Sequence, residues 1–155
     1  MNSTRLIKHS PGALGLRLFG LGPFFLPCKG MNKLKELLDK HAFWAKERDI
    51  DDLKVLLANS TVIVSVWKGK KLIGFGRATS DRIYRAVLWD IVVEENSQGS
   101  GLGRKVIEVL LSSKEMKSVE KVYLMTTNSS EFYLQNGFRR CVDQSLLIKS
   151  DRNWG

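Results

Sequence analysis

The sequence has little of what several classes of protein require. Its two cysteines, Cys28 and Cys141, are too few to cross-link a small secreted fold, and they predict reduced thiols in a cytosol-like compartment. No stretch approaches the ~20 apolar residues that span a bilayer. The isolated histidines, His9 and His41, have no partner at metal-ligand spacing, so we expect no metal. With 155 residues, 43% of them hydrophobic, the chain predicts one soluble globular domain.

Acidic residues are absent from the first 35 positions, where much of the net charge of +9 resides. A basic domain can attract nucleic acid, an anionic membrane or a phosphorylated cofactor. No Lys/Arg-rich run supports the first of these, and we expect neither nucleic acid nor a membrane as a partner. Residues 1–30 read as a basic, irregular segment of the domain with one short strand at Leu14–Phe19, because Arg17 and several Gly and Pro residues interrupt its apolar run.

Helix and strand patterns alternate along residues 31–155. Runs of β-branched and aromatic residues predict strands at Thr61–Lys68, Leu72–Ala78, Val87–Val93, Lys121–Thr126 and Ser145–Ile148. Helices are expected to begin near Asn32, Asp49 and Gly101 and to span Ser130–Gln135, the third burying Val106, Val109 and Leu110 and the last ending at Gly137. This order predicts an α/β fold with a mixed sheet and helices on its faces.

A glycine-rich turn, Gln98–Arg104, joins the buried strand that ends at Val93 to an amphipathic helix. Glycine permits positive φ and close approach of a ligand to backbone amides. The first N–H groups of a helix lack internal partners, so such a turn is a ready anion site. The turn matches neither a P-loop nor a complete dinucleotide fingerprint. The alternative is a loop that only reverses the chain.

The pattern Gln98-x-x-Gly101-x-Gly103 resembles the acyl-CoA pyrophosphate loop of the GNAT acetyltransferase superfamily. Phe132-Tyr133-x-x-x-Gly137-Phe138 is similar to that family's C-terminal signature, so the resemblance covers roughly residues 61–138. It implies a mostly antiparallel mixed sheet, an N-acetyltransferase domain over residues 31–155, and acetyl-CoA as co-substrate. The cofactor-binding residues that it implies are Ile91, Val92, Val93, Gln98, Gly99, Ser100, Gly101, Leu102, Gly103, Arg104, Asn128 and Tyr133.

The segment Phe75–Asp81, followed by Leu88-Trp89-Asp90, looks like the plastid and cyanobacterial serotonin (arylalkylamine) N-acetyltransferase branch. This resemblance implies a small primary amine as acceptor. We expect the protein in the cytoplasm, or in the plastid stroma of a plastid-bearing source, and a homodimer is left open. Glu95 and Ser97 depart from the Pro and aromatic residue that the superfamily often has there. A protein lysine or N-terminus as acceptor, and a non-catalytic acyl-CoA-binding module, are the alternatives.

Two side chains are candidates for proton transfer. Tyr133 matches the position of the family's general acid. The alternative is that Tyr133 is an ordinary half-buried aromatic residue. Asp90 is an acid inside an apolar strand, which indicates either a base or a structural partner of Arg77 or Arg85. Phe43 and Trp44 could form a flat wall for an aromatic substrate.

Overall fold

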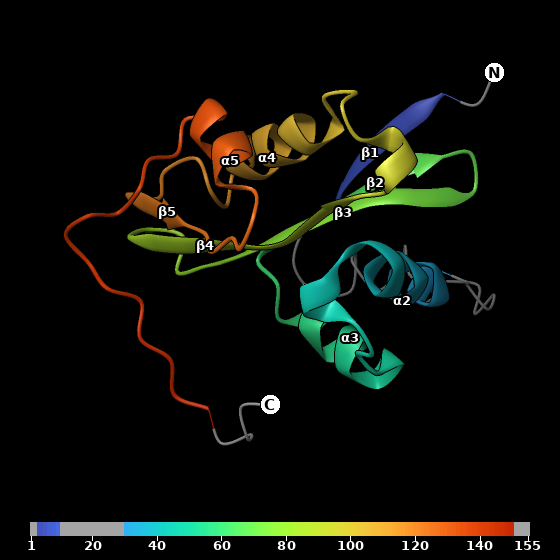
Figure 1. Ribbon diagram of the computed structural model, residues 1–155, viewed down its shortest axis with the longest axis horizontal. Helices are drawn as coiled ribbons and strands as arrows, with labels where there is room; N and C mark the ends of the chain where they lie inside the picture. Colours follow the sequence, from blue (N-terminus) through green and yellow to red (C-terminus); the bar gives the residue numbers. More distant parts are fainter. Residues whose placement is uncertain (1–2, 10–29, 151–155) are drawn as a thin grey trace. The chain divides into compact units, whose positions relative to one another are not determined.

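The computed structural model describes residues 3–9 and 30–150, which fall into two compact units divided between Met125 and Thr126 (Figure 1). The first unit contains the sheet and most of the helices, and the second contains one short helix. The strand predicted at Leu14–Phe19 and the thiol of Cys28 lie outside the described residues.

Five strands in sequence order form the sheet of the first unit: β1 (Thr4–His9), β2 (Val62–Lys68), β3 (Lys71–Ser80), β4 (Arg85–Val93) and β5 (Lys121–Tyr123). The first four pair antiparallel and β5 is parallel to β4, which confirms the mixed, mostly antiparallel sheet. β1 contradicts the irregular segment expected there. Leu6 and Ile7 are adjacent apolar residues, so this segment lacks the alternation of apolar and polar residues that predicts a strand. The strand is recognised only from its pairing with β2.

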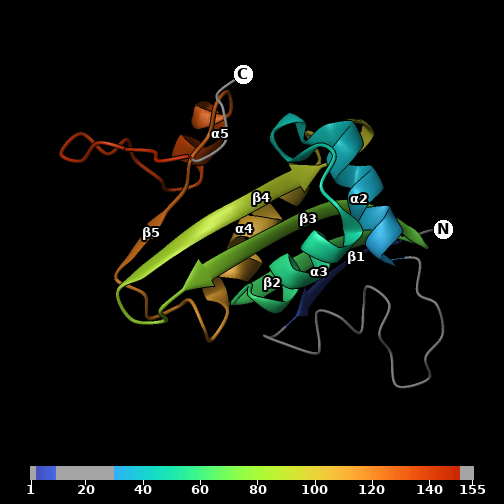
Figure 2. The same ribbon diagram turned by 90° about the horizontal axis from the view of Figure 1, so that it is seen from below.

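Helices cover both faces of this sheet, as predicted. The helices α2 (Gly30–His41) and α3 (Ile50–Ala58) lie on one face with the short 3-10 helix η1 (Phe43–Ala45), and α4 (Leu102–Ser112) lies on the other (Figures 1 and 2). The Asp49 carboxylate caps α3 by accepting from the Asp51 amide at 2.7 Å. Among the described helices none is long and apolar enough to cross a membrane.

The hydrophobic core lies mainly between α2, α3 and the sheet. Its largest fully buried members there are Leu34, Leu38, Leu53, Leu57, Ile63 and Phe75. On the opposite face α4 buries Val106, Ile107 and Leu110. The prediction of Val109 in this stripe was wrong, since Val109 is only half-buried and Ile107 takes the inward position. Both lie within one helical turn, where spacing alone does not decide which faces the sheet.

A β-bulge interrupts the pairing of β4 with β3. Phe75 pairs with Val92 and Arg77 pairs with Trp89, so two residues of β4 stand opposite the single residue Gly76. A Cβ on Gly76 would lie 2.8 Å from the Ile91 Cδ1 atom and 2.6 Å from the Val106 Cγ1 atom. Glycine is therefore required at position 76 of β3, because Ile91 of the bulge and Val106 of α4 occupy the space that a side chain would need.

The second unit contains α5 (Ser130–Gln135), as predicted, and Gly137 follows the helix with φ +88°. The strand predicted at Ser145–Ile148 is wrong: these residues are exposed and have no regular structure. The strand predicted at Lys121–Thr126 is also shorter, since β5 ends at Tyr123. In both places the residue types favour a strand, but a strand forms only along a length that pairs with a neighbour.

Candidate functional site

The loop between β4 and α4 is held in shape by its own side chains. It begins with the 3-10 helix η2 (Glu95–Ser97) and continues through Gln98 to Gly101. The Gln98 side chain donates from Nε2 to the Val93 carbonyl at 3.0 Å, and the Ser97 hydroxyl donates to Glu94 Oε1 at 2.9 Å. These bonds tie the loop back to the end of β4.

Two glycines of this loop have left-handed backbones. Gly99 has φ +79° and Gly101 has φ +81°, and a Cβ at either position would meet no atom within 4 Å. Gly101 is the N-cap of α4 and provides no side-chain cap, so the first N–H groups of the helix are open to a ligand. The Arg104 guanidinium pairs with Glu108 at 3.0 Å. The backbone amides and the helix dipole are therefore the groups of this loop that would attract an anion.

The edge of β4 that faces β5 is only partly paired. β5 pairs with β4 from Arg85 to Val87, whereas β4 continues to Val93. Within the described residues, the stretch 88–93 thus has no neighbouring strand on that side. It includes Ile91, Val92 and Val93. Unpaired strand groups can bind an extended ligand that carries amides, in the way that a sheet edge accepts another strand.

The buried carboxylate of Asp90 lies at the bulge and accepts three hydrogen bonds. Its Oδ1 accepts from Trp44 Nε1 at 3.1 Å, and its Oδ2 accepts from Arg48 Nη1 and Arg77 Nε, each at 2.9 Å. The backbone of Asp90 is left-handed, with φ +54°, which aspartate tolerates better than most residues. These donors come from η1, the segment before α3, and β3, so Asp90 connects the sheet to the helical layer above it.

The electrostatics of this cluster bear on the two roles that the sequence leaves open for Asp90. Burial alone would raise the pKa of Asp90, but the hydrogen bond from Arg48 and the charge of Arg77 outweigh it and hold the pKa below its usual 3.8. A carboxylate with a lowered pKa and two guanidinium partners is a weak proton acceptor. The geometry favours the structural role, with Arg77 rather than Arg85 as the partner, since Arg85 pairs with Glu120 at 3.3 Å.

Phe43 and Trp44 are surface residues of η1. They are 53% and 47% exposed, and their rings meet edge to face with centroids 5.2 Å apart. The hydrogen bond from Trp44 Nε1 to Asp90 fixes the orientation of the indole. The pair thus presents an oriented aromatic surface next to the ion-pair cluster.

Arg48 is the member of this cluster that the sequence did not indicate. It lies 42 residues from Asp90, and its carbonyl accepts from Lys35 Nζ at 2.9 Å, which anchors the segment that carries it. The one signal for it is general: a buried acid requires cationic or hydrogen-bonding partners. Arg48 becomes that partner only in the folded protein, where the segment before α3 comes close to Asp90 of β4.

The second unit contains the remaining candidates for chemistry. Burial raises the pKa of Tyr133 to about 12, so its phenol is protonated at neutral pH, and Phe132 and Phe138 pack edge to face against it with centroids 5.1 and 5.9 Å away. Asn128 is exposed and accepts from the Ser129 hydroxyl at 3.3 Å. Cys141 is a free, exposed thiol. Over the ranges that the structure describes, no three His, Cys, Asp or Glu side chains are grouped to hold a metal ion.

A family model for the acetyltransferase (GNAT) domain matches residues 58–140, more than half of the chain. The match runs from the end of α3 through the glycine-rich loop to the segment after α5. The chain therefore belongs to the GNAT acetyltransferase family.

Several curated proteins are similar in sequence. The chain is 35% identical over 116 residues to the uncharacterized N-acetyltransferase ycf52 of Pyropia yezoensis, covering 72% of this chain and 66% of the relative. It is 32% identical to the histone acetyltransferase TAP1 of Glycine max (68% and 50%) and 32% identical to the chloroplastic GCN5-related N-acetyltransferase 1 of Arabidopsis thaliana (68% and 57%). The chain thus spans about half to two thirds of the length of these relatives.

The fold is similar to that of solved GNAT proteins. A GNAT-family acetyltransferase of Streptococcus pneumoniae superimposes with a TM-score of 0.71 over 97% of this chain and 100% of that one, at 18% identity. At this identity the similarity shows the fold alone, and it agrees with the mixed sheet and two-sided helical covering described above.

Replacing Asp90 with Asn tests the ion-pair cluster. The change leaves the buried charge of Arg77 uncompensated, so we expect the free energy of unfolding at pH 7 to fall by about 3 kcal/mol. Because the pKa of Asp90 is lowered in the folded state, its contribution is present above pH 3.8 and is lost as the pH falls through the folded pKa. Urea denaturation of both proteins between pH 3 and 7 measures this, and the difference between them should narrow in acid.

Asp52→Asn is the matched control, because Asp52 lies exposed in the first turn of α3. It should change the free energy of unfolding by less than about 0.5 kcal/mol. If both substitutions lowered the free energy of unfolding equally, the Asp90 cluster would stabilise the fold no more than an exposed carboxylate does.

Proposed function

We propose that this GNAT domain transfers an acetyl group from acetyl-CoA to a primary amine, and that the amine is an arylalkylamine such as serotonin. The observation that carries the first part is the continuous run from the open edge of β4 into the glycine-rich loop and the uncapped end of α4. Acetyl-CoA carries an extended chain of amides followed by a pyrophosphate. It therefore needs an open strand edge for the amides, followed by an anion site for the pyrophosphate.

The residues of the loop and the open edge fit acetyl-CoA. Ile91, Val92 and Val93 would bind the pantetheine amides through their backbone groups, and residues 98–104 would hold the pyrophosphate at the start of α4. Asn128 would add a further contact. This assignment follows the family resemblance, and the left-handed Gly99 and Gly101 with open space before them support it.

Acetyl-CoA supplies an acetyl thioester whose sulfur leaves as a thiolate. Backbone N–H groups of the open β4 edge would stabilise the negative charge that develops on the carbonyl oxygen. Tyr133 would donate its phenolic proton to the thiolate, a role that its raised pKa of about 12 permits because the proton is in place at neutral pH. The nitrogen's proton would pass to water, while Asp90, already bound by three donors, keeps the strand and Trp44 in position.

The choice of an arylalkylamine rests on the branch resemblance and on Phe43 and Trp44. A half-exposed, oriented aromatic pair suits the ring of such an amine, and aromatic contacts add about 0.5–1.5 kcal/mol beyond burial of area. The net charge of +9 does not attract a cationic amine, so selection must come from this local surface.

A protein lysine is the second candidate acceptor. The specific observation in its favour is the name of the Glycine max relative, a histone acetyltransferase, at 32% identity. The Arabidopsis relative is named as chloroplastic, and this name supports the plastid stroma as the location of this protein.

Gly101→Val tests the cofactor loop. A side chain at this position would enter the space before the amides, so we expect calorimetric titration to show at least a tenfold loss of acetyl-CoA affinity. Gly69→Val is the matched control, because Gly69 also has positive φ, +60°, but lies in the turn between β2 and β3. Similar affinities of the two variants would remove the loop from the cofactor site.

Tyr133→Phe tests the proton donor with almost no change in volume. We expect the turnover number to fall about 10²-fold or more, while the Michaelis constant for acetyl-CoA changes little, because the proton transfer matters only in the transition state. Steady-state kinetics with a saturating amine measures both. Wild-type turnover would reduce Tyr133 to a packing residue.

A panel of acceptors tests the substrate. We expect serotonin and related arylalkylamines to be acetylated with higher kcat/KM than alkylamines or lysine peptides, and Trp44→Ala to raise the Michaelis constant for serotonin several-fold without a matching change for acetyl-CoA. Preference for the peptides would establish the protein acceptor instead. A folded protein that binds acetyl-CoA but acetylates no amine would be a binding module.

A further inference from the structure

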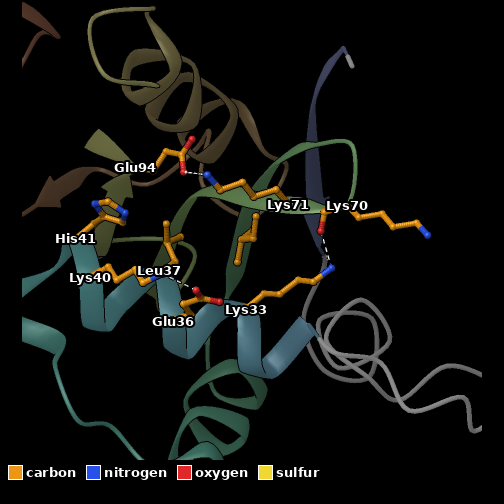
Figure 3. A pocket seen from close by; sticks show the side chains of 9 residues that line it. Lys33, Glu36, Leu37, Lys40, His41, Lys70, Lys71 and Glu94 are labelled. Carbon is orange, nitrogen blue, oxygen red and sulfur yellow. Dashed lines mark hydrogen bonds and ion pairs between the residues drawn. The ribbon is translucent and has the colours of Figure 1, made fainter. Parts of the chain in front are cut away.

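A groove of about 440 Å³ runs between α2 and the start of β3, on the first unit (Figure 3). Lys33 and His41 mark its two ends along α2, eight residues apart, which corresponds to about 12 Å of helix. Leu37 lies between these ends, Lys71 and Glu94 line the side opposite α2, and Leu72 also contributes to the lining. The volume is in the range of small-molecule sites.

Positive charge is concentrated at one end of the groove. Its lining contains four lysines and two glutamates, and Lys40 and Lys71 are paired with Glu36 and Glu94 at 2.6 and 2.7 Å. The Lys33 ammonium instead donates to the carbonyl of Lys70 and lies 5.6 Å from the Trp67 ring centroid, and no carboxylate of the described residues pairs with it. An excess positive charge therefore remains near the start of α2, while the end near His41 is neutralised.

The middle of the groove is apolar. Leu37 and Leu72 are the apolar side chains of its lining, and the aliphatic stems of Lys40 and Lys71 add to this surface while their ammonium groups reach their glutamates (Figure 3). A ligand that fits has an anionic group at one end and an apolar body about as long as the groove. We propose that this groove is a second binding site, for an elongated organic acid whose carboxylate binds Lys33.

The far end of the groove is connected to the glycine-rich loop. Glu94, which pairs with Lys71, also accepts from Ser97, and the Glu95 amide donates to His41 Nδ1 at 3.4 Å. A ligand that excludes water from the Lys71–Glu94 pair strengthens it and holds the loop in the shape described above. Occupancy of the groove therefore increases affinity for acetyl-CoA. This linkage, unlike the binding itself, rests on the proposed function.

Octanoate is a suitable probe, because its eight carbons match the length of the groove. In titrations of the full chain without acetyl-CoA, followed by NMR of the backbone amides, we expect saturable shifts at residues 33–41 and 70–72. Octanamide, with the same body but no charge, and acetate, with the same charge but no body, should each bind at least tenfold more weakly. Equal binding of either one overturns the proposed ligand class, and absence of saturable shifts at these residues overturns the site.

Lys33→Met removes the charge and keeps the apolar stem. We expect it to weaken octanoate binding at least tenfold. Lys54→Met, on the exposed face of α3, is the matched control and should leave the affinity unchanged. Thermal unfolding of both variants shows that each remains folded. Unchanged octanoate affinity in folded Lys33→Met would overturn the assignment of the carboxylate.

The linkage is measured by titrating acetyl-CoA with and without saturating octanoate. We expect about fivefold tighter acetyl-CoA binding, and the same factor for octanoate when acetyl-CoA is saturating. Octanoate binding without any effect on acetyl-CoA affinity would overturn the linkage and leave the second site. If acetyl-CoA does not bind at all, the proposed function fails while the octanoate result stands on its own.

Discussion

The bulge in β4 places an aspartate with a left-handed backbone in the middle of a buried strand. A residue in this region of φ and ψ persists only where surrounding structure over-determines it, and the cost is about 1–3 kcal/mol. Trp44, Arg48 and Arg77 offset that cost by donating to the carboxylate, and Gly76 leaves room for the displaced Ile91 side chain. The direction of β4 beyond the bulge, and so the position of its open edge and of the following loop, depends on this arrangement.

The glycine-rich loop and the groove along α2 differ in the groups that they offer to an anion. At the glycine-rich loop Glu94 and Glu95 are nearby and Arg104 is paired with Glu108, so under the proposed function backbone amides and the helix dipole would be the main groups that bind the pyrophosphate. In the groove along α2, the proposed attractive group is the Lys33 ammonium, which pairs with no carboxylate of the described residues. Backbone amides in a fixed array suit a branched pyrophosphate, whereas a single flexible ammonium suits one carboxylate.

Asp90 illustrates how one buried acid can hold neighbouring side chains in fixed positions. Two guanidinium groups lower its pKa, and this makes it a poor base but a strong anchor for the indole of Trp44. The aromatic pair is consequently held at the surface in a defined orientation although about half of the surface of each residue is exposed. Such preorganisation lowers the entropy lost when a flat substrate binds.

The sequence by itself determined the parts of this protein that depend on local patterns. Runs of β-branched residues located β2, β3 and β4, the Asp49 cap located α3, and the spacing of Gln98, Gly101 and Gly103 located the loop and indicated the family. Tertiary structure alone decided β1, because its sequence does not alternate apolar and polar residues and the strand forms by pairing with β2. Tertiary structure also left Ser145–Ile148 without regular structure. It also chose the partners of Asp90, because Trp44 and Arg48 reach it across more than 40 residues through packing that no local spacing encodes.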